Sequence, residues 1–221
     1  MKRIYIDVDT QEDFCSSTGT LFVNGAREAV NVSAKLILKA VYEKSFIFGS
    51  VDSHSHDAWE FSTNDNRGPN GEKPNFPPHC VKGTKGWLKI HSTLPEKFFF
   101  IPNMPGFRTQ TIPQGTQGIY FEKEVYSLFS NPNAINILNE YCPTQPVEFI
   151  VFGVATDYCV KTAVLGLLDW IKSSSLRKES SVIVITDAIA AVTEVTGVEA
   201  LKEMRDAGAI MTSSQKFLFA N

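Results

Sequence analysis

The sequence predicts an α/β domain with a doubly wound, mainly parallel sheet of about six strands and helices on both faces. Short β-rich runs alternate with segments of helical periodicity along the chain. Two of these runs, VEFIVFG (147–153) and SVIVITD (181–187), are almost continuously apolar, which is typical of strands covered on both faces. The length of 221 residues suits one domain, so we expect residues 1–221 to fold as a single unit.

The individual elements follow from the same patterns. Besides the two apolar runs, the predicted strands are RIYIDVD (3–9), SFIFGSVD (45–52), KFFFI (97–101) and IYFEK (119–123). Helical periodicity predicts helices over 26–44, 133–141, 157–172 and 196–207. Gly208 follows the last of these in the position that glycine favours after a helix.

Composition excludes several classes of function. The net charge of −3 and pI near 5.8 leave no basic surface for nucleic acid. No apolar run approaches the roughly 20 residues that span a bilayer, and MKRIYIDVDTQEDF is too acidic for a signal peptide. We therefore expect a cytoplasmic protein without a membrane or nucleic-acid partner. The four cysteines form no CxxC pair, which argues against a disulfide framework or a structural zinc site.

One long segment, at about 53–95, interrupts the alternation of strands and helices. It is rich in Pro, Gly and Asn and contains all four histidines: His54, His56, His79 and His91. A loop of this length inside a compact domain is usually functional or disordered. The clustering of the histidines favours a functional loop.

The residues that end the predicted strands carry reactive groups. Ligands of open parallel sheets bind beyond the C-terminal ends of the strands. Asp9 ends the first strand, Asp52 the second and Lys123 the fourth, while the bend GVATDYCV after 147–153 contains Cys159. The predicted site thus combines two acids, a cation and a thiol.

Cys159 has two competing interpretations. A lone cysteine is most often a buried core residue. Here, however, Thr156 or Asp157 can cap the following helix and place Cys159 in its first turn. The helix dipole and free N–H groups would favour a thiolate there, and the same N–H groups could hold an oxyanion.

The acid and the lysine also leave alternatives open. DVDTQEDF supplies three candidate acids: Asp7, Asp9 and Asp13. The phenyl ring of Phe14 is a candidate wall for a small pocket. Lys123 lies between Glu122 and Glu124, so it belongs either to a surface ion-pair stripe or beside a buried aspartate, which it would keep ionised.

Asp52 and His54 are two residues apart on an extended segment and therefore point the same way. A third ligand from Glu60 or His56 would complete a mixed N/O set suited to zinc, iron or manganese. His79, in the rigid sequence FPPHC, is a candidate fourth ligand or a residue that orients one. The alternative is a polar loop with solvated histidines.

Four strings in this order resemble one known family. DTQEDF, VDSH, FPPHCVKGT and GVATDYCV, with a strand-end lysine between the last two, are similar to the nicotinamidase branch of the isochorismatase-like cysteine hydrolases. The resemblance extends from about residue 3 to about residue 213. It implies a catalytic triad of Asp9, Lys123 and Cys159, so it selects Asp9 among the three candidate acids.

The resemblance also implies the rest of the site. It places an oxyanion hole at the backbone amides of Ala155 and Cys159 and a cis peptide bond between Val154 and Ala155. It assigns a divalent metal ion, zinc before iron or manganese, to Asp52, His54, Glu60 and His79.

The implied activity is hydrolysis of nicotinamide to nicotinate and ammonia through a thioester, a step of NAD salvage, with Phe14 and Phe76 on either side of the ring. A homo-oligomer is expected. Two alternatives are a hydrolase of another small amide or carbamoyl compound, and a non-catalytic metal-binding or scaffold protein with an unreactive Cys159.

Overall fold

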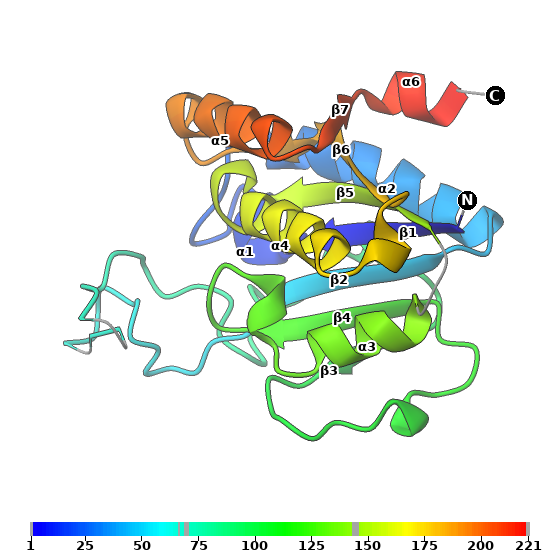
Figure 1. Ribbon diagram of the computed structural model, residues 1–221. Helices are drawn as coiled ribbons and strands as arrows, with labels where there is room; N and C mark the ends of the chain where they lie inside the picture. Colours follow the sequence, from blue (N-terminus) through cyan, green and yellow to red (C-terminus); the bar gives the residue numbers. More distant parts are fainter. Residues whose placement is uncertain (1, 66, 69–70, 143–145, 220–221) are drawn as a thin grey trace.

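The structure is a computed structural model that describes residues 2–65, 67–68, 71–142 and 146–219. Its centre is one seven-stranded sheet with the order β3-β4-β2-β1-β5-β6-β7, in which all neighbouring strands are parallel (Figure 1). The predicted parallel sheet is confirmed, and its seven strands agree with the expected number of about six.

All six predicted strands are present. The strands are β1 (Lys2–Val8), β2 (Phe46–Asp52), β3 (Phe98–Ile101), β4 (Gly118–Lys123), β5 (Val147–Val154), β6 (Ser181–Ala190) and β7 (Ile210–Thr212). The sequence did not indicate β7, because three residues at the edge of a sheet are too few for a pattern.

The helices are α1 (Glu12–Cys15), α2 (Ala26–Tyr42), α3 (Ala134–Tyr141), α4 (Lys161–Lys172), α5 (Glu194–Asp206) and α6 (Ser214–Phe219). The four predicted helices are present, and Gly208 follows α5 with φ 113°. The helix predicted over 157–172 is divided: a π-helical turn, Thr156–Val160, precedes α4. The short helices α1 and α6 were not predicted.

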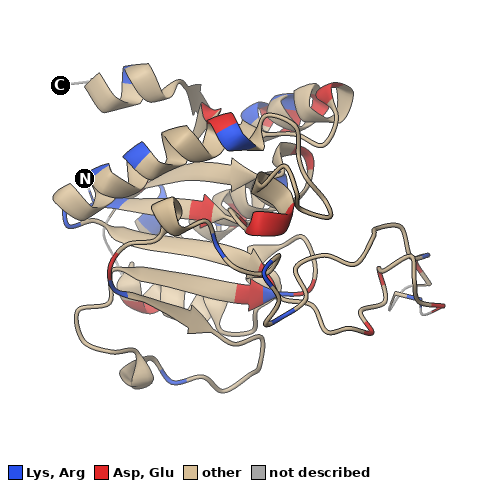
Figure 2. Cartoon of the chain, turned by 180° about the vertical axis from the view of Figure 1, so that it is seen from behind, with Lys and Arg blue, Asp and Glu red and all other residues tan. Residues whose placement is uncertain are grey.

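Helices cover both faces of the sheet, as a doubly wound fold requires. Apolar side chains of α3, α4 and α5 share one core cluster with Ile4, Ile6 and Val8 of β1. Side chains of α2 and α6 share the other cluster with Tyr5, whose side chain points to the opposite face of the sheet. Figure 2 shows that charged residues gather on the outer helices and loops, whereas the strands are largely uncharged.

Because the strands are parallel, their C-terminal ends lie at one edge of the sheet. The segment after β2, predicted as a long loop over 53–95, leaves from this edge, and part of its described chain projects from the body of the molecule (Figure 1). None of the helices among the described residues has the length and apolar character needed to cross a membrane.

Gly153 allows β1 and β5 to approach closely beside the site. Its φ is 121°, and a Cβ atom there would lie 2.0 Å from the carbonyl oxygen of Val8. Gly83 also has a positive φ, 86°, but a Cβ atom there would meet nothing within 4 Å.

We predict that Gly153→Ala lowers the free energy of unfolding by more than about 4 kcal/mol, because a clash with backbone is added to the backbone strain. Gly83→Ala, which adds strain alone, should cost about 1–2 kcal/mol. Urea unfolding followed by circular dichroism measures both. If the two variants lost the same free energy of unfolding, close packing of Gly153 against β1 would not be the cause.

Candidate active site

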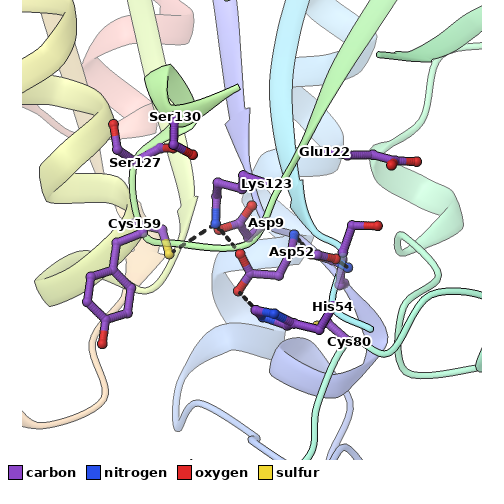
Figure 3. A network of polar contacts seen from close by, with 12 residues as sticks. Asp9, Asp52, His54, Cys80, Glu122, Lys123, Ser127, Ser130 and Cys159 are labelled. Atoms are coloured by element: carbon purple, nitrogen blue, oxygen red, sulfur yellow. Dashed lines mark hydrogen bonds and ion pairs between the residues drawn. The ribbon is translucent and has the colours of Figure 1, made fainter. Parts of the chain in front are cut away.

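The C-terminal edge of the sheet brings together four of the predicted site residues. The Nζ atom of Lys123, at the end of β4, lies 2.8 Å from Asp9 Oδ2 and 3.5 Å from Cys159 Sγ, and it also pairs with Asp52 Oδ1 (Figure 3). The side chain of Lys123 is fully buried. The lysine therefore belongs to a buried cluster and not to a surface ion-pair stripe.

The three candidate acids occupy different environments. Asp9 lies just after β1 with φ 47°, and a carboxylate oxygen of Asp9 is within 4.8 Å of Cys159 Sγ. Asp7 instead forms a buried ion pair with Lys89, at 2.9 Å. Asp13 accepts a 2.8 Å hydrogen bond from the backbone N–H of Cys80. Of the three, only Asp9 is next to the thiol and the lysine.

Burial governs the ionisation of the cluster. It raises the pKa of Asp9, which the charge of Lys123 counteracts. Burial opposes the positive charge of Lys123, yet the carboxylates of Asp52 and Asp9 raise the pKa of Lys123 well above its usual value. The lysine is thus a permanent cation.

Opposing effects act on the ionisation of Cys159. Burial raises the pKa of the Cys159 thiol well above its usual value, and Lys123 only partly offsets this. Removal from water and the carboxylates of Asp9 and Asp52 thus oppose the thiolate that the helix N-terminus and Lys123 favour, which is consistent with a base that removes the thiol proton.

The bend before Cys159 has an unusual backbone. The predicted cis peptide bond between Val154 and Ala155 is present. The carbonyl oxygen of Ala155 then accepts hydrogen bonds from the N–H groups of Tyr158 and Val160, at 3.1 and 3.0 Å, which form the π-helical turn. This turn raises Cys159 above the end of β5.

Neither of the predicted caps is formed. The N-cap position of the turn is Ala155, which makes no side-chain capping hydrogen bond, and Thr156 and Asp157 lie inside the turn. The Asp157 carboxylate instead accepts hydrogen bonds from Val192 N, at 3.0 Å, and Thr196 Oγ1, at 2.5 Å, near the start of α5. Asp157 therefore connects the cysteine turn to α5.

A cavity opens over Cys159 and contains the predicted substrate-binding rings. About 520 Å³ of free space lies within its outline, a volume that includes open solvent. Phe14 and Phe76 line it, as do Ala155 and Cys159. Sequence reasoning missed the other main walls, which are Leu21, Val23, Val125, Tyr126, Tyr158 and Val192.

The metal-ligand candidates meet beside this cavity. Asp52, His54 and His79 place donor atoms within 4.8 Å of one another. Glu60 Oε1 is 3.0 Å from His54 Nε2 and 3.4 Å from His79 Nε2, and both histidines have Asp52 Oδ2 at about 4 Å. His56 is exposed and forms none of the close contacts that the structure gives within this set. The structure thus groups Glu60, rather than His56, with the other three.

These four side chains fit a divalent cation. His54 is 1% exposed, and neither of its ring nitrogens makes a hydrogen bond of good geometry with the described residues. His79 Nδ1 is 2.8 Å from the carbonyl oxygen of Pro77, which leaves Nε2 facing the set. An ion about 2.1 Å from each ligand separates neighbouring ligand atoms by about 3–3.5 Å, close to the spacing here. The set can hold a divalent metal ion.

Gln11 is a positioning residue that sequence reasoning missed. Its side chain is fully buried and binds the backbone of Asp52 twice: Oε1 accepts from Asp52 N–H at 2.8 Å, and Nε2 donates to Asp52 C=O at 2.9 Å. Nε2 also donates to the carbonyl oxygen of Trp87 at 2.9 Å. Gln11 thereby fixes the residue shared by the lysine and the metal-ligand set.

We predict that Gln11→Ala lowers the free energy of unfolding by about 2–3 kcal/mol, because buried backbone groups lose their partners. Gln11→Glu should cost more, since it places a carboxylate against two carbonyl oxygens. Urea unfolding measures both, with Gln110→Ala at an exposed position as the control. A Gln11→Ala variant as stable as this control would refute the role.

A buried thiol with an acid and an ammonium group beside it has the groups that a cysteine hydrolase needs. The chain belongs to the isochorismatase family, because the Isochorismatase domain matches residues 4–216.

Two curated proteins and several solved structures resemble this chain. The nicotinamidase/pyrazinamidase of Mycobacterium tuberculosis is 28% identical over 212 residues, which cover 96% of this chain and 99% of that protein. The nicotinamidase of Escherichia coli is 27% identical over 176 residues, which cover 75% of this chain and 76% of that protein. The crystal structure of the Pyrococcus horikoshii pyrazinamidase in complex with zinc has a TM-score of 0.71 at 21% identity and covers 96% of this chain and 99% of its own. The crystal structure of the Bacillus subtilis nicotinamidase/pyrazinamidase has a TM-score of 0.72 at 22% identity, and the match covers 96% of this chain and 100% of that one.

Proposed function

We propose that this protein is a metal-assisted cysteine amidohydrolase that converts nicotinamide to nicotinate and ammonia. The observation that carries the proposal is that Cys159 shares one cavity with the metal-ligand set and has the Asp9–Lys123 pair beside it. The names of the two curated relatives support the same substrate.

The first half of the reaction forms a thioester. Asp9 removes the proton of the Cys159 thiol, and the sulfur attacks the carboxamide carbon. Ala155 and Cys159 both line the cavity. Their backbone N–H groups donate hydrogen bonds to the carbonyl oxygen as it becomes negative. Asp9 then transfers the proton to the departing nitrogen, so that the C–N bond breaks and ammonia leaves.

The second half releases the acid. Asp9, ionised again, removes a proton from water, and the resulting hydroxide attacks the thioester carbon. The C–S bond breaks, and the sulfur regains a proton from Asp9. Lys123 remains charged throughout and stabilises the anionic states of Asp9 and Cys159.

Asp52, His54, Glu60 and His79 would hold the divalent ion, with zinc the first candidate and iron or manganese the alternatives. When bound, the ion supplies a Lewis-acid site for the pyridine nitrogen of the substrate. The rings of Phe14 and Phe76 confine the substrate ring between them. We further propose that residues 1–221 act as one domain, in a homo-oligomer and in the cytoplasm.

The proposal predicts ammonia release from nicotinamide, and from the related amide pyrazinamide, by the zinc-loaded protein. Cys159→Ala should abolish release, and Asp9→Asn should lower kcat by about 10²–10⁴-fold, because the general base is lost. An enzyme-coupled ammonia assay measures this.

Cys142→Ala is the matched control, since Cys142 follows α3 and lies near the opposite edge of the sheet. No release by the folded, metal-loaded protein would reject nicotinamide as the substrate and direct the search to carbamoyl compounds.

The metal-ligand set gives a separate prediction. His54→Ala should weaken zinc binding by more than about 100-fold, because a buried ligand is lost, whereas the exposed His56→Ala should bind zinc as the wild type does. Competition with a chromogenic chelator measures both affinities. Equal zinc affinity in the two variants would remove His54 from the set.

A further inference from the structure

The cavity carries one acidic side chain that the mechanism does not use. Glu124 directly follows Lys123 at the end of β4, lines the same cavity as Cys159 and is exposed to solvent. Cys159, by contrast, is buried. Glu124 therefore lies on the solvent side of the cavity, where an entering or leaving ligand passes.

The charged groups that line the cavity are all acidic. They are Asp52, Glu60 and Glu124, and none of the described lining residues is lysine or arginine. Asp52 and Glu60 face His54 and His79, so a divalent ion held there would balance their two charges. Glu124 is then the uncompensated charge of the lining.

The lysine next to Glu124 in the sequence, and the lysine that pairs with Glu122, are both held by other carboxylates. Lys123 is buried against Asp9 and Asp52, and Lys82 Nζ lies 2.8 and 2.7 Å from the two carboxylate oxygens of Glu122. Among the residues that the structure describes, Glu124 forms no ion pair.

The walls around Glu124 are apolar. Val125, Phe76 and Val192 line the same cavity. A cleft with low-dielectric walls concentrates the field of a charge inside it, and like charges placed together in such a site repel each other strongly. The charge of Glu124 would repel a ligand that bears a carboxylate, whereas a neutral carboxamide carries no net charge to be repelled.

We propose that Glu124 is a specificity-determining residue that excludes anionic ligands from the cavity. This inference rests on the proposed function and names its substrate class: neutral or cationic small carboxamides. Hydrolysis converts such an amide into a carboxylate, so the charge of Glu124, which does not repel the neutral substrate, weakens the binding of the anionic product. Carbamoyl compounds that carry a carboxylate are disfavoured for the same reason.

The test compares two ligands of similar shape and different charge. Nicotinate is anionic at neutral pH, and 3-acetylpyridine is neutral. Calorimetric titration of both into the zinc-loaded protein gives the ratio of their dissociation constants in the wild type, in Glu124→Gln and in Glu124→Lys. Removing the charge should tighten nicotinate binding about threefold to tenfold at low ionic strength, and reversing it should tighten binding further. Binding of 3-acetylpyridine should not change.

Glu96→Gln is the matched control, because Glu96 is exposed and precedes β3, near the opposite edge of the sheet. This variant should leave the ratio at its wild-type value. The shift in Glu124→Gln should also shrink as salt is raised to about 0.5 M, since salt screens exposed charges.

Ammonia release from nicotinamide by the same samples separates the two proposals. If release occurs but the ratio is equal in wild type and Glu124→Gln, or if both ligands shift together, the role of Glu124 is overturned and the proposed function stands. If the ratio shifts without any release, the proposed substrate is rejected and the exclusion of anions stands. If neither ligand binds, the role of Glu124 is overturned, and ammonia release alone decides the proposed function.

Discussion

The positive charge of Lys123 is buried at the C-terminal edge of the sheet, and the rest of the site is arranged around it. A buried ammonium group costs several kcal/mol unless opposite charges surround it. Here the compensation comes from separate strands, because Asp9 follows β1 and Asp52 ends β2, while the lysine itself ends β4 (Figure 3). Cys159 completes the cluster from the turn after β5. The charge of Lys123 is compensated only when β1, β2, β4 and the turn after β5 are correctly aligned. Formation of the site is therefore linked to formation of the sheet.

Asp52 connects the two halves of the site. One of its carboxylate oxygens pairs with Lys123, and the other faces His54 and His79. The buried Lys123 cluster and the metal-ligand candidates therefore share a side chain, and Gln11 binds the backbone N–H and C=O of this residue. Any displacement of Asp52 would disturb both halves of the site. The two hydrogen bonds from the Gln11 side chain to the Asp52 backbone oppose such a displacement.

The segment after β1 anchors the long loop to the sheet. Alternate side chains of DVDTQEDF reach different partners: Asp7 pairs with Lys89, Asp9 with Lys123, Gln11 with Asp52, and Asp13 with the N–H of Cys80. Two of these partners, Lys89 and Cys80, belong to the loop between β2 and β3. Cys80 has a positive φ of 45° and directly follows His79, so Asp13 fixes the backbone beside a metal-ligand candidate. The described part of this loop has little regular structure, and hydrogen bonds and buried charges hold it to the sheet.

The sequence by itself determined the sheet, its main strands and helices, and the chemical groups at the strand ends, because apolar runs and periodicity are local properties of the chain. It left three acids as candidates and could not choose between Glu60 and His56, and the family resemblance was needed to select among them. It also could not show how strongly burial opposes the ionisation of Cys159, since the helix dipole is a local effect whereas burial depends on the whole fold. Tyr126, Tyr158 and Glu124 became part of the cavity only in the tertiary structure. The reason is geometric: the strand order β4-β2-β1-β5 places residues from distant parts of the chain side by side, and no local pattern records those distances.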